Sequence, residues 1–344
     1  MSVSAAIEPV EADSTREAHA LAFRIAFATA IGFTLGHVLG WDFPFLPALF
    51  AAQLLIGSRS LNLKQAVGFA ILMTAGCIFS VLIAQFFVET PIVLLLVLAL
   101  LIFLAFLLLA RGQAIPVASI LLITTSVVPL VAVSSLDLAY GLVHSLIAGS
   151  ILSALLVLLA YAIFPSRAPM SEAVKRPAGE DSPIAAALAN SAALLSLVIL
   201  FMFSGSPVSV IVIMTAITIL QQPASAGYGK AYAFIMGNVA GGLAATVAYL
   251  LVSLFPAPAV LLLVVLFFGL VFGGRIAEGA ALAPVYVVAL TTFLIVLGLG
   301  LTPLTDSGAI FISRVFNVVI AAAYTIGVAS VMRALFRASK SHHG

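Results

Sequence analysis

The chain has 344 residues, of which 64% are hydrophobic and only 8% are charged. A soluble domain carries about 25% charged residues, so the composition excludes a soluble protein and indicates that the chain lies in a lipid bilayer. The net charge of +2 offers no clustered basic surface for nucleic acid, and the single cysteine, Cys77, excludes an intramolecular disulfide and a zinc site built on cysteines.

Residues 1–20 precede the first apolar run and contain four acidic residues, Glu8, Glu11, Asp13 and Glu17. A secretory signal peptide has a basic start and a small-residue cleavage site, so this segment does not resemble one. We expect a short, mostly disordered cytoplasmic tail over residues 1–20.

Apolar runs bounded by charges or turn residues occupy most of the remaining chain. A helix that crosses the hydrocarbon core needs about 20 apolar residues, and these runs are continuous, without the alternation of a barrel strand. They predict an all-α polytopic membrane protein with about 12 transmembrane helices. The predicted spans are residues 21–39, 44–57, 65–87, 91–110, 115–134, 140–163, 186–204, 207–221, 231–254, 258–273, 281–300 and 309–332.

The second and eighth predicted spans are short and are interrupted by proline. Pro44 and Pro47 lie at the start of the second span, and Pro207 and Pro223 bracket the eighth. Short, proline-interrupted segments at corresponding places in two halves of a chain indicate a transport site. Alternatively, each proline begins a helix at its first turn. Both interpretations remain open.

The loop charges predict how the chain is oriented in the membrane. The loops after even-numbered spans contain basic residues, among them Arg59, Lys64, Arg111, Lys175, Lys230, Arg275 and Arg333. The loops after odd-numbered spans contain no lysine or arginine, and four of them contain an acidic residue, Asp42, Glu89, Asp137 or Asp306. The positive-inside rule then predicts a multi-pass protein of the bacterial inner membrane with both termini in the cytoplasm.

The two halves of the chain have matching layouts. Lys64 and Lys230, which open the third span of each half, lie 166 residues apart, and so do Gly76 and Gly242. Six spans in each half is an even number, so both halves share one orientation, as in a parallel repeat. We predict two parallel six-helix repeats over residues 21–164 and 186–334. A polar, proline-rich linker, 165–185, separates them, and a cytoplasmic tail, 335–344, follows.

Machinery for catalysis is not visible in the sequence. No acidic residue lies in the middle of a predicted span, and the chain contains no HExxH, Walker or GxSxG motif. These motifs carry metal-dependent, phosphate and serine-nucleophile chemistry. We therefore expect no catalytic residues, no metal site and no cofactor, and we do not predict an enzyme.

Two of the ionisable residues inside predicted spans are candidate site residues, Arg314 and His144. Arg314 lies one to two turns inside span twelve, with Asn317 on the same helix face. A charge there is costly and normally faces protein or a water-filled cavity, and a guanidinium suits a carboxylate. The alternative is that Arg314 snorkels to the outer headgroups or pairs with Asp306. His144, its counterpart in span six, either titrates across the proton gradient or is a neutral, hydrogen-bonded histidine.

Further polar residues could line a path for substrate or define the inner mouth. Predicted lining residues in the spans are Asn238, Thr124, Thr125, Thr291 and Thr292. Asn238 lies among Gly237, Gly241 and Gly242, which alternatively indicate close helix packing with hydrogen bonds across the helices. Lys64 and Lys230 either attract anions at the inner mouth or serve only as topology anchors.

The stretch GYGKAYAFIMGNVAGGLAATVA, residues 227–248, resembles the signature of the fusaric acid resistance and aromatic acid exporter (FUSC) superfamily. SRSLNLKQAVGFAILMTAGCIFSVLIAQ, residues 58–85, resembles a weaker copy. The opening FRIAFATAIGFTLGHVLGWDFPFLPALFAAQL, residues 23–54, is similar to the start of compact, DUF2955-type members. The resemblance implies efflux of small aromatic or other organic acids, and a periplasmic membrane-fusion adaptor as a partner.

The sequence as a whole predicts an efflux transporter for small organic anions, with aromatic carboxylic acids as the preferred class and the proton gradient as the driving force. A passive anion channel and a non-transporting membrane scaffold for an adaptor remain alternatives, and the prediction leaves homo-oligomerisation open.

Overall fold

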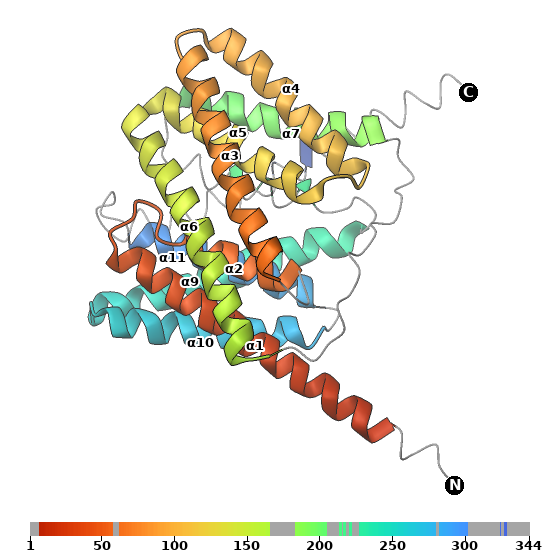
Figure 1. Cartoon of the computed structure of the whole chain (residues 1–344), viewed down its shortest axis with the longest axis vertical. Helices are drawn as coiled ribbons and strands as arrows, with labels where there is room; N and C mark the ends of the chain where they lie inside the picture. Colours follow the sequence, from red (N-terminus) through yellow and green to blue (C-terminus); the bar gives the residue numbers. More distant parts are fainter. Residues whose placement is uncertain are drawn as a thin grey trace. The chain divides into compact units, whose positions relative to one another are not determined.

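A computed structural model describes residues 7–57, 62–165, 183–204, 227–279 and 282–301, together with 213–214, 216–217, 220–221, 324 and 327–328. Over these residues the fold is all-α, with ten helices and no β-strand (Figure 1). The helices are α1 (Ile7–Val38), α2 (Leu46–Gly57), α3 (Leu63–Phe87), α4 (Pro91–Ala110), α5 (Ile115–Ser134), α6 (Leu136–Ile163), α7 (Pro183–Ser204), α9 (Gly227–Leu254), α10 (Pro258–Ala277) and α11 (Ala283–Gly300).

Nine of the described helices are long and apolar enough to cross a membrane, and α2 is the exception. Helices of this length and composition define a multi-pass membrane protein. Predicted spans one to seven and nine to eleven each coincide with a described helix. Predicted spans 207–221 and 309–332 lie largely outside the described residues.

The first helix is longer than the sequence analysis predicted. α1 begins at Ile7, and not near residue 21, so the expected disorder does not hold for residues 7–20. The segment from Thr15 to Ala22, TREAHALA, is rich in alanine, arginine, glutamate and leucine, which are strong helix formers. The apolar span that follows supplies a helix from which this polar stretch can extend.

Proline and glycine set several helix boundaries. Proline lies in the first turn of α4, α5, α10 and α11, where the missing N–H costs nothing. Gly112 follows α4 and Gly279 follows α10, with φ of 68° and 65°, as is common after a helix end. Pro47 is the second residue of α2, so the first-turn interpretation is confirmed for this proline. Pro207 and Pro223 lie outside the described residues.

The chain divides into two compact units. The first unit comprises residues 1–70, 148–174 and 232–311, and the second comprises 71–147, 175–231 and 312–344. The described part of the first unit contains α1, α2, α10 and α11, most of α9 and the second part of α6. The described part of the second unit contains α4, α5 and α7, most of α3 and the first part of α6.

In the first unit, α1 packs along α10 and against α2. Gly269 and Gly273 of α10 make the close approach to α1 possible, because a Cβ at Gly269 would lie 2.9 Å from Ala26 Cα and one at Gly273 would lie 3.3 Å from Ile25 Cβ. Aromatic rings fill the space between α10 and α11, where Phe268 and Phe293 lie 4.9 Å apart between ring centroids.

Helix α2 is short and largely enclosed within the first unit. Its 12 residues reach about 18 Å at 1.5 Å per residue, less than the roughly 30 Å of a hydrocarbon core. Most of its side chains are buried. Glycines of three other helices approach the segment 44–48 closely, namely Gly32 and Gly36 of α1, Gly149 of α6 and Gly298 of α11.

In the second unit, α4 packs along α7 and α5. Gln85 of α3 donates a hydrogen bond from Nε2 to the Tyr140 hydroxyl of α6 over 2.6 Å. Pro129 lies inside α5 and cannot donate to the Thr125 carbonyl four residues earlier.

The two units do not coincide with the two predicted sequence halves. The first unit combines α1 and α2, from the first half, with α9, α10 and α11, from the second. The second unit combines α3, α4 and α5, from the first half, with α7, from the second. In each unit the first predicted span of one half therefore packs along the fourth span of the other half, as α1 on α10 and as α7 on α4.

Candidate functional site

Helix α1 places a buried cation in the first unit. Arg24 is 1% exposed and is the one charged residue that is buried among those the structure describes. It lies three residues inside the predicted span that begins at residue 21. Buried charges are expensive unless they are paired and hydrogen-bonded, so the groups around Arg24 form a candidate functional site.

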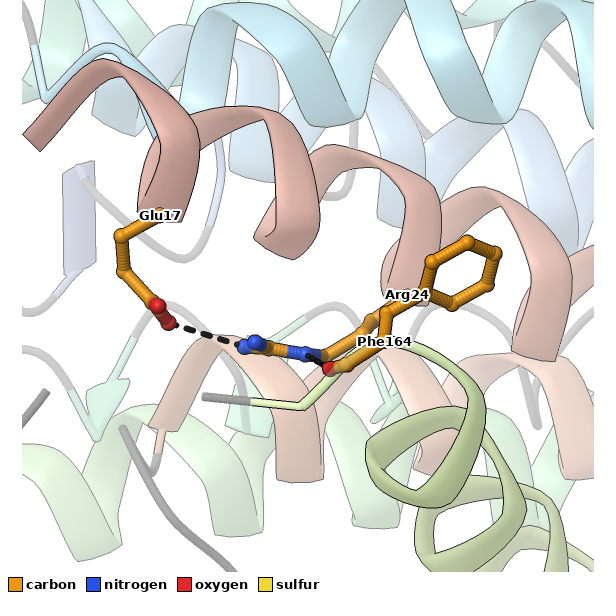
Figure 2. A network of polar contacts seen from close by, with 3 residues as sticks. All are labelled: Glu17, Arg24 and Phe164. Carbon is orange, nitrogen blue, oxygen red and sulfur yellow. Dashed lines mark hydrogen bonds and ion pairs between the residues drawn. The ribbon is translucent and has the colours of Figure 1, made fainter. Parts of the chain in front are cut away.

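Three groups surround the Arg24 guanidinium, and Figure 2 draws two of them, Glu17 and Phe164. Its Nε donates to the Phe164 carbonyl oxygen over 2.6 Å, and its Nη1 donates to Glu17 Oε1 over 3.1 Å. Its Cζ lies 4.7 Å from the centroid of the Tyr161 ring, which is a cation–π contact. Glu17 and Arg24 are seven residues apart, close to two turns of α1, so they share one face of that helix.

The sequence explains why the Phe164 carbonyl is available. α6 ends at Ile163, and the last carbonyls of a helix have no donor within it. A cation at this end is also favoured by the helix dipole. The Phe164 ring stacks on Phe23 of α1 at 5.7 Å and meets Phe27 edge-on at 6.2 Å. Arg24 therefore fastens the end of α6 to α1.

The guanidinium keeps one nitrogen uncommitted. In the part of the chain that the structure describes, Arg24 Nη2 is buried and has no hydrogen-bond partner. A guanidinium offers five N–H donors in a planar fork, and a carboxylate can accept two of them in parallel. The cluster of Glu17, Arg24, Tyr161 and Phe164 therefore binds one carboxylate, that of Glu17, and leaves the Nη2 donors of Arg24 unused among the described residues. We call these four residues the Arg24 cluster.

A second polar contact joins α9 and α11 in the same unit. Thr292 Oγ1 donates to Asn238 Oδ1 over 2.8 Å, and both side chains are buried. A Cβ at Gly237 would lie 2.6 Å from the Val285 carbonyl oxygen, and one at Gly241 would collide with the Ala289 carbonyl. The packing interpretation of these two glycines is therefore confirmed, and the structure brings Asn238 and Thr292 together. We call this contact the α9–α11 seam.

The corresponding helices of the second unit form the α3–α5 seam. A Cβ at Gly76 would lie 3.1 Å from Thr124 Oγ1. Thr124 and Thr125 are fully buried, and their hydroxyls donate to carbonyls of their own helix, Thr124 to Ile120 over 3.0 Å and Thr125 to Leu121 over 2.6 Å. In both seams a glycine of the third span of a half lies against a threonine of its fifth span.

The other residues predicted from the sequence have different surroundings. His144 on α6 and Lys64 at the start of α3 are exposed, and Thr291 is half-buried. Lys230 lies in α9, but its side chain is not described, and Arg314 and Asn317 lie outside the described residues. Their predicted roles stay predictions.

The Arg24 cluster was not predicted from the sequence. Arg24 lies near the end of an apolar run, where an arginine is ordinarily explained by snorkelling or by the positive-inside rule. One signal was available, because Glu17 lies two turns away on the same helix face. The contact with the Phe164 carbonyl could not be predicted, because every residue has a backbone carbonyl.

The fold is that of a multi-pass membrane protein, with a buried cation where α1 meets the end of α6. Residues 21–160 match the model of a family described as "Protein of unknown function (DUF2955)". This stretch is less than half of the chain. It contains Arg24, whereas Glu17 precedes it and Tyr161 and Phe164 follow it. No curated protein and no solved structure matches the chain.

Proposed function

We propose that this protein is an efflux transporter for small organic anions, with aromatic carboxylic acids as the preferred class. The observation that carries the proposal is the recurring packing of the two units. A first span packs along a fourth span of the other half in each unit, and a glycine lies against a threonine in each seam. Transporters are commonly built from such internal repeats, with the substrate site near the repeat interface.

The sign of the buried charge supports an anionic substrate. Among the described residues, Arg24 is buried, whereas no acidic residue is. An arginine suits a carboxylate because its fork can donate two parallel hydrogen bonds. Arg314, which the sequence predicts inside span twelve, would supply a second cation within a span.

The finer architecture is part of the same proposal. The distribution of lysine and arginine supports twelve spans in two parallel six-helix repeats. It also supports cytoplasmic placement of both termini and location in the bacterial inner membrane. The resemblance of residues 227–248 to the FUSC signature supports membership of that superfamily and a periplasmic membrane-fusion adaptor as partner.

Everted inner-membrane vesicles provide the test. Export from the cell becomes uptake in this orientation, so vesicles that contain the protein should accumulate radiolabelled benzoate or 4-hydroxybenzoate against its concentration gradient. A protonophore should abolish the uptake if the proton gradient drives it. Vesicles from cells that lack the protein are the control, and equal uptake by both kinds of vesicle for a panel of carboxylates would contradict the proposal.

The same vesicles separate the rival functions. Flux that runs only down the gradient and ignores the protonophore would make the protein an anion channel. The absence of flux, together with capture of a periplasmic adaptor by the purified protein, would favour a scaffold.

A further inference from the structure

We propose that Arg24 binds the carboxylate of the substrate, and that Glu17 of the same helix is an internal carboxylate which the substrate displaces. This inference rests on the proposed function, because it names the group that recognises the exported anion. It assigns Arg24 as a binding residue and Glu17 as its built-in competitor.

The difference in burial between the two partners supports an exchange. The Arg24 side chain is 1% exposed, whereas that of Glu17 is 30% exposed. Arg24 is fixed by the Phe164 carbonyl and by the Tyr161 ring, so it cannot follow a departing partner easily. Glu17 lies on the polar N-terminal part of α1 and can return to water, where a carboxylate is well solvated. The fixed cation therefore stays, and the carboxylate exchanges.

The uncommitted nitrogen supplies part of the driving force. Arg24 Nη2 has no hydrogen-bond partner within the described part of the protein, and a buried donor in that state costs free energy. A substrate carboxylate that takes the place of Glu17 can accept from Nη1 and Nη2 in parallel. Displacement thus replaces a contact at Nη1 by a bidentate pair that also satisfies Nη2.

Charge balance explains why the substrate would exchange with Glu17 and not simply join it. With Glu17 in place, Arg24 is already neutralised, and a second carboxylate beside it would meet a like charge. In the absence of substrate, Glu17 relieves the cost of leaving a cation buried and unpaired. The pair therefore has a stable resting state, and substrate affinity is the difference between two carboxylates.

The structural alternative is that the ion pair only fastens α1 to the end of α6. The two possibilities predict opposite effects for Glu17→Gln. If Glu17 is a competitor, its neutral replacement should tighten substrate binding about tenfold, because hydrogen bonds to charged partners are roughly twice as strong as neutral ones. If Glu17 is only a fastener, the variant should lose stability and gain no affinity.

The experiment measures radiolabelled benzoate binding to the full-length purified protein by equilibrium dialysis. Glu17→Gln should lower the dissociation constant about tenfold, and Glu17→Asp, which keeps the charge on a shorter side chain, should lower it less. Arg24→Lys keeps the charge but loses the planar fork, so it should weaken binding about tenfold. Glu278→Gln is the matched control, since it breaks an exposed ion pair of α10, Arg275–Glu278 at 3.2 Å, and should leave affinity unchanged.

The outcomes separate this inference from the proposed function. Unchanged benzoate affinity in both Glu17 variants, in a protein whose wild type transports benzoate in vesicles, overturns the inference alone. Tighter binding by Glu17→Gln without transport by the wild type supports the site and overturns the exporter. Absence of binding and transport in the wild type and in every variant, for benzoate and for the whole panel of carboxylates, overturns both.

Discussion

The α9–α11 seam and the α3–α5 seam each place a glycine against a threonine, but they hold their helices together in different ways. In the first, Thr292 donates to Asn238 across the seam over 2.8 Å. In the second, Thr124 donates to the Ile120 carbonyl of its own helix. Met73, which precedes Gly76 by the same three residues that separate Asn238 from Gly241, is buried and apolar.

The difference teaches that close packing is the shared feature, whereas the bond from Thr292 to Asn238 has no counterpart in the bonds that Thr124 and Thr125 make among the described residues. In a bilayer, helices gain no hydrophobic free energy by leaving lipid for one another, so small residues that permit close approach carry much of the association. The contacts made by a Cβ at Gly241 involve backbone of α11, whereas those at Gly76 involve side chains. The α9–α11 seam is therefore the tighter of the two.

The largest difference between the seams is expected for alanine in place of the glycines. In Gly241→Ala the new Cβ would collide with the Ala289 carbonyl and lie 2.9 Å from Thr292 Cβ. The backbone of α11 would have to shift, so we expect a loss of about 2–3 kcal/mol in the free energy of unfolding. Denaturation of the purified protein in detergent, followed by circular dichroism, measures this loss.

Gly76→Ala is the matched variant in the other seam. Its Cβ would lie 3.1 Å from Thr124 Oγ1 and 3.2 Å from Ile120 Cγ2, and these side-chain atoms can move by a few tenths of an ångström. We expect a loss below about 1 kcal/mol. Gly68→Ala, where no atom of the described residues lies within 4 Å of the new Cβ, controls for the substitution itself. Equal losses at Gly241 and Gly76 would contradict the proposed difference between the seams.

An exchange of residues between the seams should have the next largest effect. Met73→Asn buries an amide in the α3–α5 seam and should cost about 1–3 kcal/mol, because the amide must find partners among apolar neighbours. Asn238→Met gives the α9–α11 seam an apolar residue of similar reach. It should cost about 1 kcal/mol, the range measured for hydrogen bonds between membrane helices.

Comparison of the two variants in the same unfolding assay checks this order. A stabilising Met73→Asn would mean that Thr124 turns to the new amide, and the two seams would then be interchangeable. The Asn238→Met variant also tests the substrate-lining prediction, since unchanged benzoate transport in vesicles would assign Asn238 to packing alone.

Helix positions were predictable from the sequence because length and hydropathy are properties of a segment by itself. Predicted spans 91–110 and 115–134 coincide with α4 and α5. The packing of α1 on α10 was not predictable, because the sequence of neither helix indicates which other helix it contacts. Arg24 was missed because its partner at Phe164 lies 140 residues away and is a backbone carbonyl. Asn238 was identified as a polar residue among glycines, but its bond to Thr292 required the structure.

The smallest expected effect separates the two threonines and isolates the hydrogen bond between helices. Thr292→Val keeps the shape of the side chain but removes the donor to Asn238, so we expect a loss of about 0.6–1.7 kcal/mol in the free energy of unfolding. Thr124→Val removes a hydroxyl that bonds to a carbonyl of its own helix. Such back-bonding slightly destabilises helices, so its removal should change stability by no more than about 0.5 kcal/mol, the low end of the net contribution of one hydrogen bond. A double-mutant cycle of Thr292→Val with Asn238→Met removes the contribution of side-chain shape. A coupling free energy near zero would show that the contact in the α9–α11 seam is packing alone, and the two seams would then differ only in how closely their helices approach.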